Sequence, residues 1–162
     1  MFFLNRVYSR ADINAVVGGS MHANLPMVES RIVAVCISPI LHPKGPDVIF
    51  VGKKEDDAAG ILAAQHEAVP VFVKMTPGKW EFLGRYRAYK SSNLPSVIEA
   101  HTHDCRSKGV VRVVLLKRYY DEQNSRSRRD EMARFFENPN RRRRSRPPTK
   151  MNRSLPAFSR RF

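Results

Sequence analysis

Apolar residues in the first two thirds of the chain recur with helical spacing in some segments and strand spacing in others. Ser9-Arg10-Ala11-Asp12 has the S-x-x-D form of a helix start. Ile13, Val16 and Val17 then share one helix face, and Gly18-Gly19 is typical of a helix end. The pattern therefore predicts a short first helix.

Runs of β-branched residues bounded by prolines and glycines predict buried strands. The strands are expected at residues 32–37, 48–51, 69–75 and 110–116. Helical spacing behind Asp56 and behind Leu94-Pro95 predicts two further helices, over residues 56–66 and 94–105.

A hairpin is predicted at Thr76-Pro77-Gly78-Lys79, because Pro presets one turn dihedral and Gly supplies another. In the returning strand, strict alternation places Trp80, Phe82, Gly84, Tyr86 and Ala88 on one face. Glu81, Arg85 and Arg87 fall on the opposite, charged face.

The predicted order is helix, strand, strand, helix, strand, strand, helix, strand. Since a hairpin joins the central strands, a wholly parallel sheet is excluded. We expect an α+β domain over residues 1–117, with a mixed, strongly curved sheet or open β-barrel flanked by helices.

The remaining chain divides into two parts. Residues 118–138 contain a helical stripe of Met132, Phe135 and Phe136, which could dock on the domain or bind a partner, with full disorder of the segment as the third alternative. Residues 139–162 are rich in arginine and proline and are expected to form a disordered tail.

Positive charge is concentrated at the C-terminal end. Residues 1–117 hold 15 Lys and Arg against 10 Asp and Glu, whereas residues 118–162 hold 14 against 5. Such a basic segment favours a polyanionic partner, and nucleic acid is the expected one through phosphate contacts. The phosphate-binding candidates are Arg141, Arg142, Arg143, Arg144 and Arg146. A tail that serves only solubility or localisation is the alternative.

The loop between the first helix and the first long strand has a composition suited to ligand contact. Its candidates are Gly18, Gly19, Ser20, His22 and Asn24, which combine flexible backbone with hydroxyl, imidazole and amide groups. The alternative is that the glycines only end the helix and that the polar residues are ordinary loop residues. Trp80 and Tyr86 likewise fit either a stacking platform or the core.

One cluster of potential ligands, His101-Thr102-His103-Asp104-Cys105, raises the question of an enzyme. On a helix only His101 with Asp104 or Cys105 would share a face, and no second ligand segment accompanies them. Cys36 lies in a strand pattern and is expected to be a small core residue. We therefore predict no catalytic residue, no metal and no cofactor, with a small nuclease using His101, His103 and Asp104 as the alternative.

Several segments in succession resemble a known family. They are Tyr8–Ile13, Gly18-Gly19-Ser20, Val48–Gly52, Val69–Lys74 and the strand Trp80-Glu81-Phe82-Leu83-Gly84-Arg85-Tyr86. Together they resemble the SRA and PUA-like modified-base readers of restriction-associated proteins, including the SRA-like domains fused to HNH endonucleases.

The resemblance spans residues 8–117 and implies a curved, PUA-like barrel that holds a flipped base in a concave pocket. It implies that Gly18, Gly19, Ser20 and Gly52 lie by the pocket or the DNA. It also implies that Gly84 lets the strand bend near Trp80 and Tyr86. No HNH nuclease accompanies the domain in this chain, so cleavage by the chain alone is not expected.

These observations predict a non-catalytic protein that binds nucleic acid, with DNA as the expected target and a modified base as the feature read. A nuclease subunit is a further expected partner, and a protein-interaction module is a second alternative function. No segment reaches the roughly 20 apolar residues of a membrane span, and no signal peptide is evident, so an intracellular location is expected, cytoplasmic or nucleoid-associated, or nuclear in a eukaryote.

Overall fold

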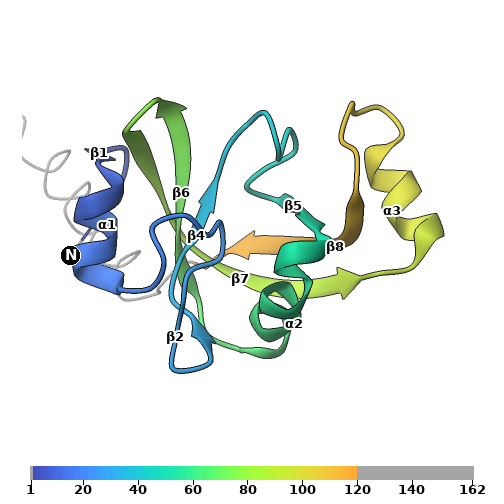
Figure 1. Ribbon diagram of the computed structural model, residues 1–162, viewed down its shortest axis with the longest axis horizontal. Coiled ribbons are helices and arrows are strands. Elements are labelled where there is room, and N and C mark those ends of the chain that lie inside the picture. The colour runs from blue at the N-terminus through green and yellow to red at the C-terminus, as the bar shows by residue number, and fades with distance from the viewer. Residues whose placement is uncertain (1, 120–162) are drawn as a thin grey trace, which may run out of the picture. The chain divides into compact units, whose positions relative to one another are not determined.

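A mixed six-stranded sheet organises residues 2–119, the part of the chain that the computed structural model describes (Figure 1). The strands are β1 (Val7–Tyr8), β2 (Met27–Val28), β3 (Arg31–Ile32), β4 (Val35–Ile37), β5 (Val48–Gly52), β6 (Val69–Thr76), β7 (Lys79–Ser92) and β8 (Val110–Arg118). The helices are α1 (Arg10–Val17), the 3-10 turn η1 (Lys53–Glu55), α2 (Asp56–Ala64) and α3 (Pro95–Thr102). Strands β2 and β3 form a separate small hairpin.

The sheet order is β4-β6-β7-β8-β5, and β1 pairs with β7 beside this path. Only β4 and β6 run parallel, while the other neighbours are antiparallel. The predicted α+β class and mixed sheet are therefore confirmed. Within residues 2–119 the sheet is not closed into a barrel, because β4 and β5 stand at opposite ends of the order.

Two local predictions are confirmed in detail. Ser9 caps α1 in a complete capping box, in which its side chain accepts from the N–H of Asp12 and the Asp12 carboxylate accepts from the N–H of Ser9. The Thr76–Lys79 turn joins β6 to β7, and Gly78 adopts a φ of +76°.

The single strand predicted over residues 32–37 is wrong, because it is divided into β3 and β4. The N–H and C=O of Ile32 are both bonded by the Gln65 side chain, at 3.0 Å each, and the N–H of Val33 donates to Pro26. These bonds to groups outside a strand satisfy the backbone of Ile32 and Val33, so the strand pairing stops there. The helices α2 and α3 also end at Ala64 and Thr102, before the predicted residues 66 and 105.

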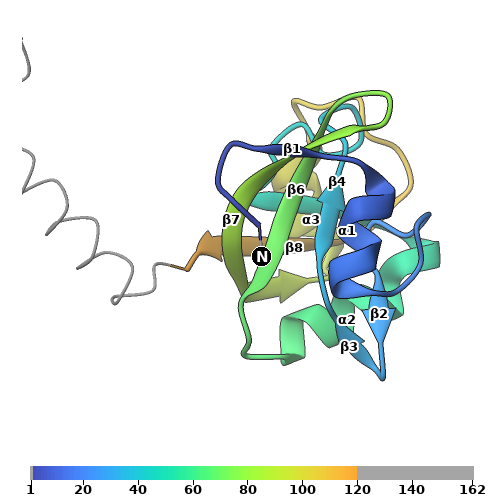
Figure 2. The same cartoon turned by 90° about the vertical axis from the view of Figure 1, so that its left-hand side faces the viewer.

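The sheet separates two apolar clusters. The larger, here called the α2 core, joins Leu62 of α2 to Val71 of β6 and Val114 of β8. The smaller, here called the α1 core, joins Ile13 of α1 to Phe72 and Phe82, with α1 lying beside β4 (Figure 2). Both faces of the sheet are thus covered where β4, β6 and the first half of β7 lie.

A β-bulge in β7 changes which residues face each core. Val71 pairs with Gly84 and the next residue, Phe72, pairs with Phe82, so Leu83 is the extra residue. Gly84 has a φ of +116°, which L side chains rarely adopt. As a result, Phe82 faces the α1 core whereas Tyr86 faces the α2 core.

None of the helices within residues 2–119 combines the length and apolar character that crossing a membrane requires.

The turn between β4 and β5 is anchored by His42, which is 4% exposed. Its Nδ1 accepts the N–H of Phe50 at 3.2 Å, which places the ring proton on Nε2 in the neutral form. Burial lowers the pKa of His42, and the nearby Glu55 carboxylate opposes this only in part. The folded protein therefore favours the neutral imidazole.

The free energy of unfolding should fall as the pH drops below about 6.5, the ordinary pKa of histidine. Below that value the unfolded chain takes up a proton that folded His42 resists, so protonation favours unfolding. We expect His42→Gln, whose amide oxygen can accept from Phe50, to lose part of this dependence in urea denaturation between pH 5 and 7.5. An unchanged pH dependence in the variant would contradict this role for His42.

Candidate nucleic-acid interface

The predicted loop after α1 is shaped by two glycines with positive φ. Gly18 has a φ of +79° and Gly19 of +81°. A Cβ on Gly19 would lie 2.8 Å from the Cβ of Pro26, closer than real contacts allow. These glycines thus permit a close approach between the loop and the backbone at Pro26 and Met27 of the same chain.

Arg10 holds this loop from α1. Its Nη2 donates to the carbonyl oxygens of Ser20 at 3.0 Å and Ala23 at 2.6 Å. The guanidinium also lies 5.4 Å from the ring centroid of Trp80, within the range of a cation–π contact. The loop is therefore fixed to α1 and, through Arg10, to the start of β7.

Asn24 is bound at the other end of the loop. Its N–H donates to Oε1 of Glu55 at 2.8 Å and its Nδ2 donates to Oε2 at 3.0 Å. Because Asn24 is committed to Glu55, only Ser20 and His22 of the loop's polar candidates present exposed side chains. Gly52 is also exposed, at the end of β5 three residues before Glu55.

Trp80 and Tyr86 do not share a face, and the prediction that they do is wrong. The bulge at Leu83 lies between them. Trp80 is half-buried against the α1 core, whereas Tyr86 is 7% exposed within the α2 core. The structure supports the alternative interpretation, that both are packing residues.

The His101–Cys105 segment is used in local contacts. Lys44 donates to the carbonyl of His101 at 2.7 Å and pairs with Asp104 at 2.9 Å. The hydrogen bond from Lys44 is the main cause that lowers the pKa of Asp104 to about 2. Residues 2–119 contain no group of three His, Cys, Asp or Glu that could hold a metal ion.

Cys36 is fully buried in β4, as predicted for a core residue. Burial raises the pKa of its thiol to about 11, and the charge of Arg10 opposes this only in part. At neutral pH the thiol is therefore protonated, which makes it a poor nucleophile.

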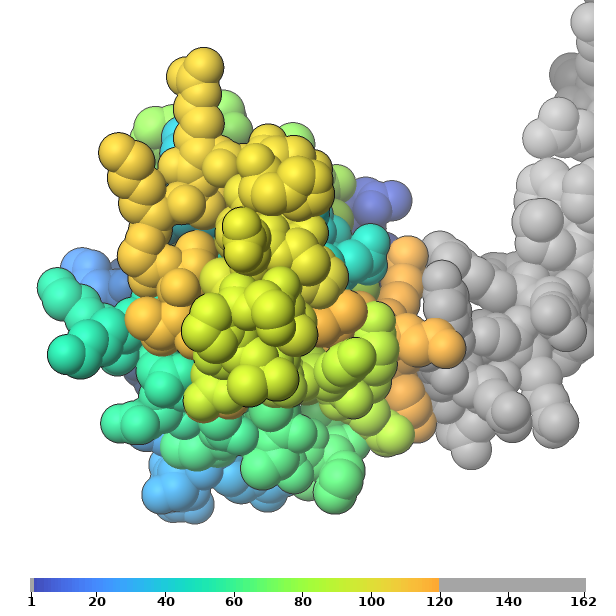
Figure 3. Space-filling view, turned by 90° about the vertical axis from the view of Figure 1, so that its right-hand side faces the viewer, coloured from blue at the N-terminus to red at the C-terminus, as the bar shows by residue number. Residues whose placement is uncertain are grey.

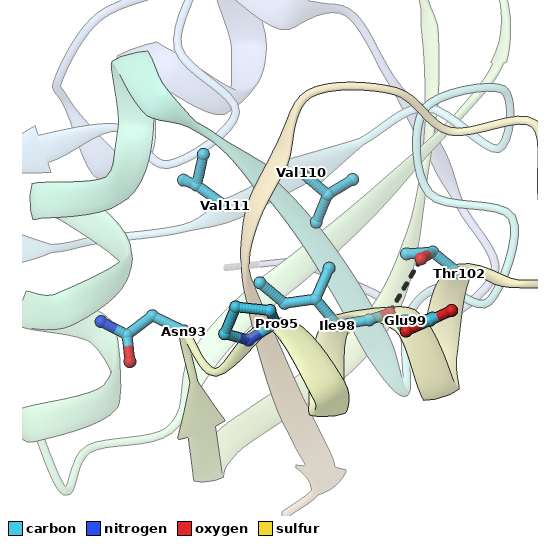
Figure 4. Close-up of a pocket in the computed structure, with 7 residues that line it drawn as sticks. All are labelled: Asn93, Pro95, Ile98, Glu99, Thr102, Val110 and Val111. Carbon is cyan, nitrogen blue, oxygen red and sulfur yellow. Dashed lines mark hydrogen bonds between the residues drawn. The ribbon is translucent and has the colours of Figure 1, made fainter.

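A cleft of about 460 Å³ lies between α3 and β8 (Figure 4). Its lining residues are Asn93, Pro95, Ile98, Glu99, Thr102, Val110 and Val111. The hydroxyl of Thr102 donates to the carbonyl of Ile98 at 2.8 Å, so it is engaged within the helix. With Glu99 as its charged residue, the cleft is unsuited to phosphate.

The surface best suited to nucleic acid lies on β7 and the end of β8, after the bulge. We call it the strand-face patch, and its members are Arg85, Arg87, Tyr89, Lys90, Lys117 and Tyr119, all of them exposed. Figure 3 shows the yellow-green atoms of this part of β7 beside the orange atoms at the end of β8. Four of the six side chains carry a positive charge at neutral pH and none carries a negative one.

Strand pairing brings these residues together. Arg87 pairs directly with Lys117, and the N–H of Tyr119 donates to the carbonyl of Arg85 at 2.8 Å. The guanidinium of Arg87 lies 5.3 Å from the ring centroid of Tyr119. Cations and tyrosine rings thus alternate across neighbouring strands.

The first bulge is what turns this surface outward. Arg85 pairs with Pro70 of β6 and lies on the same side of the sheet as the α1 core. The α1 core itself packs against an earlier part of β7, around Phe82. The guanidinium of Arg85 is held by the carbonyl of Ala68 at 2.6 Å. A second irregularity skips Tyr89 between Ala88 and Lys90, so Tyr89 stands out of the ladder.

The sequence contained a signal for this surface. The alternation predicts a charged face with Arg85 and Arg87, but it is the aromatic face of the strand that is expected from the sequence to contact a base. Tyr119 lies beyond residue 117, the predicted end of the domain, so its pairing with β7 was missed. The phosphate-binding candidates Arg141–Arg144 and Arg146, and the predicted segments 118–138 and 139–162 from Tyr120 onward, lie outside the described residues.

Comparisons of this chain with models of protein families, with curated proteins and with solved structures found no match.

We expect Glu55→Ala to destabilise the protein by about 1–3 kcal/mol, because it leaves the two Asn24 donors without an acceptor. Urea denaturation measures this change. Asp57→Ala removes an exposed carboxylate one residue into α2 and serves as the control. Equal stability of the two variants would show that the Glu55 contacts do not hold the loop.

Proposed function

We propose that this protein is a non-catalytic nucleic-acid-binding protein, with DNA as its target. The observation that carries the proposal is the strand-face patch, where Arg87, Lys90 and Lys117 lie on paired strands next to two exposed tyrosines. Such a surface attracts phosphates and gains affinity by releasing counterions.

The charge distribution of the whole chain supports the same function. The net charge is +14, and the 45 residues from Arg118 onward hold 14 of the 29 Lys and Arg. Arg141–Arg144 and Arg146 would add phosphate contacts that do not depend on base sequence.

A nuclease receives less support from the geometry. Asp104 is paired with Lys44, and Nδ1 of His103 lies 3.0 Å from the carbonyl of Ala100. These contacts give the cluster a role in joining α3 to the turn before β5. The protein-interaction alternative rests on Phe135 and Phe136, which lie outside the described residues.

The fold proposed from the resemblance is a PUA-like or SRA-like one. The mixed sheet, the long bent strand β7 and the flanking helices support it as an architecture. If a modified base is read, Ser20 and His22 are the exposed loop residues for the contact.

Fluorescence anisotropy with the full-length chain and a labelled DNA tests the proposal. The patch variant Arg87→Ala/Lys90→Ala/Lys117→Ala should bind at least tenfold more weakly, and its slope of log K against log salt should fall by about 3. The matched control, Lys53→Ala/Lys54→Ala/Lys79→Ala, removes the same charge from exposed positions elsewhere and should bind nearly as the wild type does.

Equal losses in the two triple variants would show that only total charge matters and would remove the patch as the binding site. The same assay with duplexes that carry N6-methyladenine or 5-methylcytosine tests base reading. A preference of tenfold or more, about 1.4 kcal/mol, would establish a modified-base reader. Equal affinities would leave a binder without base preference.

A further inference from the structure

The two tyrosines of the strand-face patch are exposed to solvent. Tyr89 is 60% exposed and Tyr119 is 45% exposed, although both belong to or adjoin regular strands. Tyr89 stands out of the ladder at the second bulge, and Tyr119 is fixed by its N–H bond to Arg85. Neither ring is needed to fill a core, so each is available to an external planar group.

Exposed aromatic rings beside positive charges favour single-stranded over duplex nucleic acid. In a duplex the base faces are stacked on one another, and only base edges are accessible in the grooves. A tyrosine on a sheet face therefore gains little from paired bases beyond contact with the backbone. Unpaired bases expose their faces, and each base stacked on an aromatic ring contributes about 1–3 kcal/mol.

We propose that the strand-face patch binds single-stranded nucleic acid, with Tyr89 and Tyr119 each stacking on an unpaired base. This inference rests on the proposed function and names the form of its target. Arg87 and Lys117 contact the phosphates between the stacked bases, and Lys90 contacts the backbone beyond the base on Tyr89.

The spacing of the patch fits an extended strand. Side chains two residues apart on one strand face are about 6.7 Å apart, and paired residues on neighbouring strands lie closer still. Along the strands the groups follow one another in the order Lys90, Tyr89, the Arg87–Lys117 pair, and then Tyr119 beside Arg85. Tyr89 thus has cations on both sides and Tyr119 has the Arg87–Lys117 pair next to it, so that rings and cations alternate as bases and phosphates do along a nucleic-acid strand.

Arg87 prepares the Tyr119 ring for stacking. Its guanidinium lies 5.3 Å from the ring centroid, while Tyr119 as a residue stays 45% exposed. The cation restricts the motion of the Tyr119 ring, so the ring loses less conformational entropy when a base stacks on it. It also stays close enough to reach a neighbouring phosphate.

The test compares an unstructured single-stranded DNA, a duplex hairpin that contains the same sequence, and a single-stranded RNA of that sequence, all with the full-length chain at about 150 mM salt. Tyr89→Leu/Tyr119→Leu keeps apolar bulk but removes both rings, and Tyr89→Phe/Tyr119→Phe keeps the rings. We expect the Leu variant to bind single-stranded DNA at least tenfold more weakly with unchanged duplex affinity. The Phe variant should stay within about twofold of wild type on both.

A second readout is ultraviolet crosslinking to a single strand that contains bromodeoxyuridine, mapped by mass spectrometry. Crosslinks at peptides that contain Tyr89 or Tyr119 would support stacking, and crosslinks confined to other peptides would overturn it. Circular dichroism confirms that each variant is folded.

The outcomes separate this inference from the proposed function. If the Leu variant weakens neither form, or weakens both equally, while the Arg87/Lys90/Lys117 variant weakens both, the stacking inference fails and nucleic-acid binding stands. If the charge variant also has no effect, both fail. Equal affinity for DNA and RNA single strands supports stacking, because the rings do not contact the 2′-hydroxyl. A tenfold preference for RNA would keep the single-strand inference and overturn DNA as the target.

Discussion

The β-bulge at Leu83 and Gly84 is the constraint on which the rest of the arrangement depends. It lets one continuous strand contribute Phe82 to the α1 core and Tyr86 to the α2 core. Without the extra residue, strict alternation would place Tyr86 on the side of Phe82 and would turn Arg87 toward the α2 core. The charged surface is thus a direct result of how the core is divided.

The bulge requires a backbone that few residues can adopt. Gly84 has a φ of +116°, and a Cβ there would lie 3.2 Å from Nε of Arg118 and 3.5 Å from Leu4. A side chain would therefore be both strained and crowded. Glycine at this position therefore permits both the bulge in the sheet and the close approach of Leu4 from the N-terminal segment.

Local signals in the sequence were the ones that predicted structure well. The capping box at Ser9 and the turn at Pro77-Gly78 depend on neighbouring residues alone, and both were predicted correctly. The resemblance implied a bend at Gly84, but the bulge itself, with Leu83 as its extra residue, could not be predicted, because it exists only in the pairing of β7 with β6. The break in the strand over residues 32–37 was missed for a similar reason, since Gln65 lies 33 residues from Ile32.

The candidate site shows the same division between local and distant causes. Gly18 and Gly19 were predicted either to contact a ligand or only to end the first helix, and Gly18 is the C-cap of α1, as the second interpretation expects. That Asn24 would be taken by Glu55, 31 residues away, was not visible from either segment. The patch needed Tyr119 to be beside Arg85 and Arg87, a proximity created only when β8 pairs with β7.

The contact between Arg10 and Trp80 makes the fluorescence of Trp80 sensitive to the loop after α1. Trp80 is the single tryptophan of the chain, and its ring is flanked by Arg10 at 5.4 Å and Lys74 at 6.0 Å. Its emission therefore depends on the position of two cations, one of which also clamps the loop after α1. Trp80 lies before the bulge, so tryptophan fluorescence reports on the loop and the α1 layer. The tyrosines of the strand-face patch lie beyond the bulge, so tyrosine fluorescence includes a contribution from the other end of β7.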